Sequence, residues 1–442
     1  MKTTTIGPNR LPVEAVQNCL RRGKTPFYLY DQGLIRKRCR LLQEMPNAFG
    51  VFPRYAMKAN STRAILQEIH AAGVGIDASS FNEVRRAEMA GIPLENMLLT
   101  TQEAPFGEDL DTLVTSIEQG LRYNICSQTQ LENIAVRLAP EKRRFSIRVH
   151  PGVGSGESVT RNTGDKYSCF GVHLSDLPAL LSRAHELGVV FDQVHVHIGS
   201  GGDPAVWEEN IDRELGFVET YFPQATRVNF GGGFKEARMP HETAADVYKL
   251  GQTAKKKVEE FYEKTGRKLT TEVEPGNFLV ANSGYLVTRV ADIKQTGDQG
   301  FTFILLDGGM EVNLRPLLYG AQHPFYILDE HGTVRFDEFH TDQHCEERED
   351  LIVVGRCCES GDSYTLQDDH AIVPRSMIRP RVGDTCIVGG VGAYCSSMTP
   401  FNYNSHEQIS EYLLTERGEC HCIRSRQRLE QIVQNEHSLP PA

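Results

Sequence analysis

The chain has 442 residues, with 47 basic and 58 acidic side chains, which give a net charge of −11. This acidic balance argues against a protein that binds nucleic acid or an anionic membrane surface. No apolar run approaches the ~20 residues of a membrane helix, and the first stretch of the chain lacks the apolar segment of a secretory signal. The 11 cysteines are scattered and odd in number, which suits a reducing cytoplasm better than a disulfide framework. We expect a cytoplasmic protein of two or three domains.

A strand-like run at residues 24–31 comes first, and a regular alternation of apolar strands and helices follows it. Helix-like segments such as 81–91 and 174–188 lie between most of the strands, and several of them end in glycine. Eight strands that alternate with helices predict an α/β protein built on a (β/α)8 barrel, with a doubly wound open sheet as the alternative. The predicted strands lie at residues 51–57, 74–78, 97–101, 122–126, 144–149, 191–197, 226–230 and 269–273.

The pattern changes after residue 280. Short β-type runs separated by Gly, Asp and Pro turns follow, for example at 301–306 and 385–389. Residues 407–442 are polar, with a predicted short helix and a loose end. We therefore predict a barrel domain at 32–280, and a mostly-β, Greek-key-like barrel domain formed by 1–31 together with 281–442.

Lys58 lies where the first barrel strand ends, directly before a predicted helix start at Asn60 and Ser61. A lone lysine is usually a surface or salt-bridged side chain. The alternative is an amine that forms a Schiff base, because a buried lysine readily loses its charge and becomes nucleophilic. The other strand ends decide between the two interpretations.

Polar or glycine-rich residues stand at six strand ends, which share one rim in a barrel and form the usual place for catalysis. The glycines of 231–233 let a phosphate approach the backbone, or simply make a tight turn. Ser200 could add a hydroxyl to that phosphate. His197 could lie against an aromatic ring, or be a satisfied core histidine. Glu274 could bind a protonated ring nitrogen, or pair with a nearby Arg or Lys.

Together, these features predict a pyridoxal phosphate site, and aldolase-type Schiff-base barrels remain the alternative. No metal site is expected, because the fragment 420–422 (Cys-His-Cys) has no second ligand pair at zinc spacing.

Seven motifs in register along nearly the whole chain resemble the barrel-type (alanine-racemase-like, fold type III) pyridoxal-phosphate decarboxylases. Within that family the chain is most similar to the diaminopimelate decarboxylases. The motifs are Tyr55–Asn60, His195–Ser200, Gly231–Gly233, Glu274–Gly276, Arg315–Gly320, Cys358–Asp362, and Gly392–Tyr394 with Met398 and Tyr403–Asn404.

The resemblance implies that Lys58 carries the cofactor, that His197 stacks on its ring and that Glu274 binds its nitrogen. Asp77 would lie near the Schiff base. The cofactor would be bound further by Arg148, Ser200, Gly232, Gly233, Gly276, Asn277 and Tyr394.

The resemblance also implies how the substrate is bound. Arg315 and Tyr319, with Tyr394 beside them, would hold a substrate carboxylate, which the arginine fork fits. Cys358 and Glu359 would enter the active site from the partner subunit of an obligate homodimer. Cys358 would give a proton to the carbon that loses carbon dioxide, and Glu359 would bind the distal amino group.

The implied reaction is decarboxylation of meso-diaminopimelate to L-lysine, a lyase activity of amino-acid biosynthesis. Three positions depart from the family pattern, because Asn277 replaces an arginine, His150 an asparagine and Cys169 a lysine. A related carboxylated diamine or basic amino acid, from siderophore, antibiotic or polyamine biosynthesis, is therefore the alternative substrate. An amino-acid racemase and an inactive decarboxylase-like regulator are more distant alternatives.

Overall fold

The computed structural model describes residues 11–152, 167–199, 204–340, 346–367 and 369–440. The chain divides into two compact units. The first unit contains Arg36–Glu236 and Thr243–Leu279, and the second contains the described residues before Arg36, Ala237–Glu242 and the chain from Val280 onward. Among the described residues, no helix is both long enough and apolar enough to cross a membrane. The ten cysteines within the described ranges are all free thiols.

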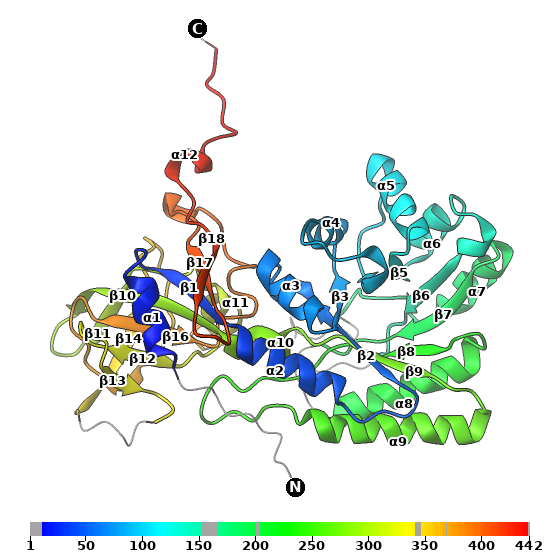
Figure 1. Ribbon diagram of the computed structural model, residues 1–442, viewed down its shortest axis with the longest axis horizontal. Helices are drawn as coiled ribbons and strands as arrows, with labels where there is room; N and C mark the ends of the chain where they lie inside the picture. The colour runs from blue at the N-terminus through cyan, green and yellow to red at the C-terminus, as the bar shows by residue number, and fades with distance from the viewer. Residues whose placement is uncertain (1–10, 153–166, 200–203, 341–345, 368, 441–442) are drawn as a thin grey trace. The chain divides into compact units, whose positions relative to one another are not determined.

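The first unit is built on a closed barrel of eight parallel strands (Figure 1). The strands follow one another around the barrel in chain order, and the last pairs with the first through Val273 and Pro53. This confirms the predicted eight-stranded barrel and excludes the open doubly wound sheet. The strands are β2 (Val51–Ala56), β3 (Gly75–Ala78), β4 (Met97–Leu99), β5 (Arg122–Ile125), β6 (Arg144–Arg148), β7 (Val190–His195), β8 (Arg227–Asn229) and β9 (Thr270–Val273).

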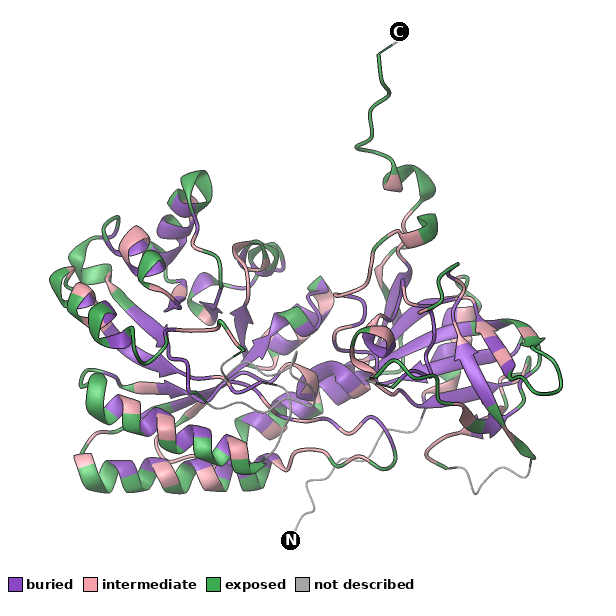
Figure 2. Ribbon diagram, turned by 180° about the vertical axis from the view of Figure 1, so that it is seen from behind, coloured by how far each residue is buried: buried purple, intermediate pink, exposed green. Residues whose placement is uncertain are grey.

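Helices follow most of the barrel strands, and several begin at a side-chain cap. The Ser80 hydroxyl, for example, accepts a hydrogen bond from the Glu83 N–H at 3.2 Å. Figure 2 shows barrel strands that are almost wholly buried and surrounding helices with both exposed and buried residues. The helices are α2 (Gln32–Gln43), α3 (Arg63–Ala71), α4 (Phe81–Met89), α5 (Gly107–Glu118), α6 (Gln128–Ala135), α7 (Leu177–Glu186), α8 (Pro204–Tyr221), α9 (Val247–Thr265) and α10 (Asn277–Val280).

One layer of the barrel interior is ionic rather than apolar. The Arg54 Nε donates to Oε2 of Glu272 at 2.8 Å, and an Arg122 nitrogen donates to Oε1 at 3.1 Å. The Gln193 amide also donates to Glu272, at 2.9 Å. Burial opposes the charge of Glu272, but the two guanidinium groups prevail and lower its pKa from 4.5 to about 2. Glu272 is therefore a buried carboxylate whose charge the protein itself balances.

The second unit is mostly β, as predicted, and its described strands form one branched ten-stranded sheet. The sheet branches at β10, which pairs with β1, β11 and β16. The strands are β1 (Phe27–Asp31), β10 (Gly284–Gln295), β11 (Thr302–Leu306), β12 (Phe325–Leu328), β13 (Val334–Asp337), β14 (Arg348–Val354), β15 (Arg375–Ile378), β16 (Thr385–Gly389), β17 (Ser410–Leu414) and β18 (Cys420–Arg424).

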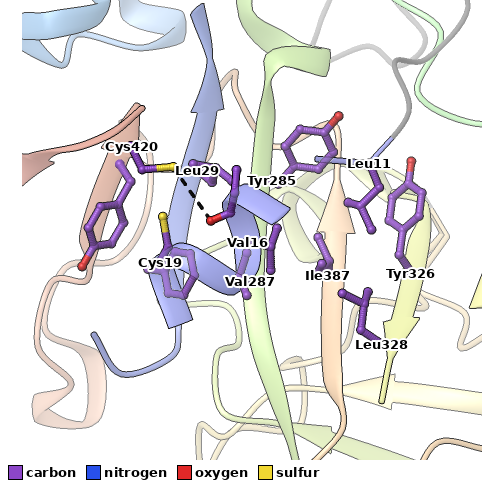
Figure 3. Close-up of a cluster of buried hydrophobic side chains, with 13 residues drawn as sticks. Leu11, Val16, Cys19, Leu29, Tyr285, Val287, Tyr326, Leu328, Ile387 and Cys420 are labelled. Atoms are coloured by element: carbon purple, nitrogen blue, oxygen red, sulfur yellow. Dashed lines mark hydrogen bonds between the residues drawn. The ribbon is translucent and has the colours of Figure 1, made fainter. Parts of the chain in front are cut away.

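The core of this unit forms where helix α1 (Val13–Leu20) covers the sheet (Figure 3). Side chains from β1, β10, β12, β16, β17 and β18 meet the buried face of the helix, so segments from both ends of the chain share one core. Helices α11 (Arg315–Tyr319) and α12 (Leu429–Ile432) complete the unit. The core residues are Leu11, Ala15, Val16, Cys19, Phe27, Leu29, Tyr285, Val287, Tyr326, Leu328, Ile387, Tyr412 and Cys420.

The C-terminal region differs from its prediction. The predicted short helix is present as α12, but the polar stretch before it contains the hairpin of β17 and β18. The polar side chains that obscure these strands in the sequence include Glu411 and Arg424, which are opposite each other in the hairpin and form an ion pair at 3.3 Å.

Candidate active site

Lys58 lies in a short 3-10 turn, η1 (Met57–Ala59), immediately after β2. Its neighbours Met57 and Ala59 are buried, whereas the Lys58 side chain is exposed. The Lys58 ammonium acts electrostatically on Asp77 and Glu274, and it lowers the pKa of both carboxyl groups. The sequence therefore places an accessible amine among the buried groups at the carboxyl end of the strands.

Glu274 follows β9 and is held by neutral partners. The Asn229 amide donates to its Oε1 atom at 2.6 Å, and the Nε2 atom of His195 lies 3.1 Å from Oε2, outside good hydrogen-bond alignment. Burial raises the pKa of Glu274, and the Asn229 hydrogen bond, Arg148 and Lys58 oppose that rise. Within the described ranges, Glu274 therefore lacks the Arg or Lys ion pair that was the alternative to a ring-nitrogen ligand.

Asp77 is the third residue of β3 and is buried. Burial raises its pKa well above the usual value, Glu274 raises it further, and Lys58 and a hydrogen bond with Thr100 lower it. Its Oδ1 atom has no hydrogen-bond partner among the described residues. A buried carboxyl oxygen in this position is available to a ligand.

His197 is fixed by the glycine run at 231–233. Its Nδ1 atom accepts the N–H of Gly232 at 2.9 Å, and its ring is nearly parallel to that of His195, with centroids 6.5 Å apart. Gly231 and Gly233 have φ values of +66° and +96°, which glycine adopts without strain. A Cβ atom at Gly231 would come within 2.7 Å of His197 Nδ1. Glycine is thus required here for close packing against His197, whether or not a phosphate binds.

The remaining predicted cofactor ligands in this unit are also near strand ends. Arg148 ends β6, is buried, and lies 5.1 Å from the ring centroid of Phe170. Gly276 and Asn277 follow Glu274, where α10 begins. Ser200 lies outside the described residues.

The other two departures from the family pattern also have defined environments. The imidazole of His150 is held between the carbonyl of Ser168 and the N–H of Gly152, each at 3.2 Å. Cys169 is exposed.

In the second unit, the loop that carries Cys358 and Glu359 is pinned by a separate turn. The Cys358 N–H donates to the Asn404 side chain at 2.9 Å, and the Tyr403 hydroxyl donates to Glu359 at 3.0 Å. Cys358 and Glu359 are both exposed. Asn404 has a left-handed backbone, with φ of +50°, a conformation that carries strain in a residue other than glycine.

The neighbouring Cys357 differs from Cys358 in its burial and in the hydrogen bond of its thiol. It is buried, and its thiol donates to Glu311 at 3.2 Å. Burial, followed by Glu311, raises the pKa of Cys357 well above the usual range. Of the two adjacent thiols, only Cys358 is exposed.

The predicted carboxylate ligands form a second group in this unit. Arg315 begins α11 and is buried, and its guanidinium carbon lies 5.7 Å from the ring centroid of Tyr319. Burial raises the pKa of Cys395 to about 11, and both Arg315 and Arg238 counter that rise. The two buried arginines therefore act on a common region, which also contains Tyr394 next to Cys395 in the chain. Arg238 is a residue that the sequence analysis missed.

The sequence analysis also assigned no role to three residues around Glu274. Asn124 in β5, His195 in β7 and Asn229 in β8 are all buried. A signal was present, because each asparagine interrupts an apolar strand near its carboxyl end. The sequence does not reveal that His195 and Asn229 lie next to the Glu274 carboxylate, or that Asn124 contacts His195.

A barrel rim of this composition fits pyridoxal phosphate. The rim has an accessible amine, a carboxylate whose partners are neutral, a second buried carboxyl oxygen without a partner, and glycines that bring the backbone close to a histidine ring. Lys58 would hold the aldehyde carbon, and Glu274 would hold the ring nitrogen. The fold and these residues define the class as a barrel-type pyridoxal phosphate enzyme.

Comparison with known proteins gives the family. Residues 32–281 match the family described as pyridoxal-dependent decarboxylase, pyridoxal binding domain. The chain is 32% identical to the diaminopimelate decarboxylase of Escherichia coli K12, over 92% of this chain and 93% of that protein. It therefore belongs to the pyridoxal-dependent decarboxylases, which are lyases that use pyridoxal phosphate.

Solved structures agree with this assignment. A crystal structure of diaminopimelate decarboxylase is similar with a TM-score of 0.86 and 28% identity, covering 96% of this chain and 97% of that one. The Helicobacter pylori diaminopimelate decarboxylase complexed with L-lysine gives a TM-score of 0.79 and 26% identity, covering 95% of this chain and 99% of that one.

Proposed function

We propose that the chain decarboxylates meso-diaminopimelate to give L-lysine and carbon dioxide. The observation that carries the proposal is the buried Glu274 among neutral partners at the barrel rim, in a chain that is similar to a diaminopimelate decarboxylase over 92% of its length. The relative from Helicobacter pylori is described in complex with L-lysine, the product that this reaction forms.

The cofactor would supply the reactive groups, and the protein would hold and orient them. Pyridoxal phosphate supplies an aldehyde that binds the substrate amine and a ring that accepts the electron pair left on the substrate carbon when carbon dioxide departs. Lys58 would hold the cofactor between turnovers, and Glu274 would keep a proton on the ring nitrogen. His197 would stack on the ring, and Asp77 would lie near the amine.

The remaining contacts of the cofactor also stay proposals from the family resemblance. The residues are Arg148, Ser200, Gly232, Gly233, Gly276, Asn277 and Tyr394.

The proton that replaces the carboxylate is assigned to Cys358. Its exposed side chain supports this role, whereas the thiol of Cys357 is buried and already donates to Glu311. We expect Cys358→Ala to lower turnover by about a hundredfold, the scale of a lost general acid. Cys357→Ser is the matched control, because a serine hydroxyl can still donate to Glu311, and its turnover should stay near that of the unmodified enzyme.

Two buried arginines support a substrate with a second carboxylate. Arg315 would bind it together with Tyr319, and Arg238 offers a second cation in the region around Cys395. Asn277 stands where the family pattern has an arginine. An arginine fork suits a planar carboxylate. This departure from the family pattern favours one alternative, a related carboxylated diamine, as the substrate.

The quaternary structure is part of the proposal. We expect a cytoplasmic homodimer in which Cys358 and Glu359 of one subunit complete the site of the other. If so, mixing Lys58→Ala and Cys358→Ala subunits should restore up to about a quarter of the active sites, because half of the dimers are mixed and each mixed dimer has one intact site. No recovery after verified subunit exchange would contradict the shared site.

The substrate is tested by carbon dioxide release from the cofactor-loaded enzyme. Meso-diaminopimelate should be turned over with lysine as the product, and lysine, ornithine, arginine and 2,3-diaminopropionate derivatives should not. Turnover of another diamine, with none of diaminopimelate, would overturn the substrate and direct attention to Asn277 and His150. Racemisation without carbon dioxide release would overturn the reaction.

A further inference from the structure

A chain of buried side chains leads from Asn124 to Glu274. The Asn124 amide nitrogen lies 2.6 Å from Nδ1 of His195 and 3.3 Å from the Thr100 hydroxyl oxygen. On its other side, Nε2 of His195 lies 3.1 Å from Glu274. Asn124, His195 and Asn229 are almost completely buried, with at most 1% of each residue exposed.

The direction of each contact follows from the chemistry of the groups. An amide nitrogen is only a donor, so Nδ1 of His195 accepts from Asn124. Burial, with Arg148 and Lys58, lowers the pKa of His195 well below its usual value, so the ring is neutral and carries one proton. That proton is therefore on Nε2, the nitrogen nearest Glu274.

A proton on Nε2 favours the ionised form of Glu274. An N–H 3.1 Å from a carboxylate oxygen attracts the anion even when the alignment is poor, whereas a lone pair in the same place would repel it. Asn229 donates to the other oxygen of Glu274 at 2.6 Å. Both oxygens of the carboxylate thus face donors that carry no net charge.

The reverse orientation of the Asn124 amide would invert this arrangement. Its oxygen would then accept from Nδ1, which would leave a lone pair on Nε2 and favour a protonated Glu274. That orientation would also direct the amide hydrogens to the place where Oδ1 now has no hydrogen-bond partner. Two buried donors without partners cost more than one unsatisfied oxygen.

We propose that Asn124 and His195 are positioning residues that keep Glu274 in its carboxylate form and aim it, by fixing which nitrogen of His195 carries the proton. This inference rests on the proposed role of Glu274 toward the ring nitrogen, and it is independent of which amino acid is decarboxylated. A carboxylate holds a positive charge on that nitrogen, whereas a carboxylic acid does not.

Other charges around Glu274 belong to the same balance. Burial and Glu272 raise its pKa, while Asn229, Arg148 and Lys58 lower it, and Glu274 itself raises the pKa of Asp77 and Glu214. The dyad of Asn124 and His195 differs from these groups because it acts through an oriented neutral hydrogen bond. Its removal therefore takes no charged side chain away from the rim.

The test is infrared spectroscopy of the cofactor-free protein at neutral pH. The band of a protonated carboxylic acid is assigned to Glu274 by its loss when Glu274→Gln is added to each variant. His195→Leu and Asn124→Leu should develop this band, because both remove the oriented N–H that favours the ionised form of Glu274. A rise of about one unit in the pKa of Glu274 would raise the ratio of its protonated to its ionised form tenfold. His195→Gln should not develop it, because a glutamine can accept from Asn124 and donate to Glu274.

Cofactor binding gives a second readout. The dissociation constant of pyridoxal phosphate should rise about tenfold in His195→Leu, with a change in the visible absorption of the bound cofactor. The fall in kcat should exceed any change in KM, and His195→Gln should recover most of the loss. Asn210→Leu is the matched control, because Asn210 is another buried asparagine of the same unit and its side chain makes no hydrogen bond to any described residue.

Two results would overturn the proposal. One is a folded His195→Leu protein with no protonated Glu274 and unchanged cofactor affinity. The other is His195→Gln behaving like His195→Leu, which would mean that the imidazole packs rather than directs a proton. A wrong substrate assignment would leave the infrared result unchanged, so the two failures can be told apart.

Discussion

Glu272 and Glu274 stand two positions apart around the end of β9, yet they have opposite surroundings. Glu272 is enclosed by the guanidinium groups of Arg54 and Arg122, and its pKa falls to about 2. Glu274 faces the neutral groups of Asn229 and His195, and its pKa rises. Both carboxylates are buried, so burial alone does not explain the difference.

The comparison shows how a barrel separates stability from function within one strand. A buried carboxylate that the protein neutralises serves the structure, because removing its partner leaves an uncompensated charge. A buried carboxylate whose hydrogen-bond partners are neutral retains its attraction for a cation from outside. The positively charged ring nitrogen of a bound cofactor is such a cation.

The largest expected effect is on stability, from Arg54→Met. The free energy of unfolding should fall by about 3–5 kcal/mol, because the change leaves Glu272 buried without its two-point partner. Denaturant unfolding can be followed by the fluorescence of Trp207, the single tryptophan, which is buried in the barrel unit.

A matched control exists for this variant. Arg36 and Glu68 are 2.7 Å apart with partly exposed side chains, and Arg36→Met should cost less than about 1 kcal/mol. Equal losses for the two arginine variants would contradict a structural role that is special to the ionic layer.

Glu274→Gln should lower activity rather than stability. Turnover should fall by about 100–1,000-fold, the scale of a lost electrostatic partner of the reacting system. Unfolding monitored by Trp207 should show no loss of stability, because the neighbours of Glu274 are neutral. Glu272→Gln provides the comparison, and it should lose stability instead. A Glu274→Gln protein that unfolds as readily as Glu272→Gln would break the distinction.

The two carboxylates should also give opposite pH dependence. The pKa of Glu272 is about 2 in the folded protein and 4.5 normally, so its contribution is present above pH 4.5 and is lost as the pH falls toward 2. The loss amounts to about 3 kcal/mol. Glu274 has a raised pKa, so its contribution is full below pH 4.5 and is lost as the pH rises through the folded-state value.

Unfolding measurements between pH 3 and 7 check these signs. Glu272→Gln should reduce the acid sensitivity of the barrel, and Glu274→Gln should remove a loss of stability at higher pH. The same slope in both variants would contradict the assignment of the two roles.

The smallest expected effect comes from Gln193→Met. Gln193 donates to Glu272 at 2.9 Å, but the two arginines remain after its removal. The free energy of unfolding should fall by about 1 kcal/mol, the value of one neutral hydrogen bond. Cofactor absorbance and turnover should match the unmodified enzyme, and a loss as large as that of Arg54→Met would show that the amide, not the charge, dominates the ionic layer.

The barrel could be predicted from the sequence because each strand is a local apolar run and the closure follows from their regular alternation. Lys58 and Glu274 could be located for the same reason, since each directly follows such a run. Asn124, His195 and Asn229 could not be identified, because their function depends on which strands meet in space. A polar residue near the end of an apolar strand is the only sign that the sequence offers.

The β-rich unit was harder to predict from the sequence for a related reason. The hairpin of β17 and β18 is partly polar, and Glu411 and Arg424 satisfy each other across it rather than through solvent. A sequence pattern reports the polarity of a residue but not the partner that neutralises it. The same limitation concealed Arg238 until its place beside the Cys395 region was known.

The position of β1 constrains the order of events during synthesis. β1 pairs with β10 on one side and, in parallel, with β17 on the other, so Phe27 is opposite both Val287 and Ser410. Almost the whole chain lies between β1 and β17. On a ribosome, the barrel strands therefore emerge before either partner of β1 has been made, and the ladder can close only when β17 leaves the exit tunnel. An exposed strand edge is a template for pairing with other chains, so slow translation at any point before β17 emerges should favour aggregation of the nascent chain.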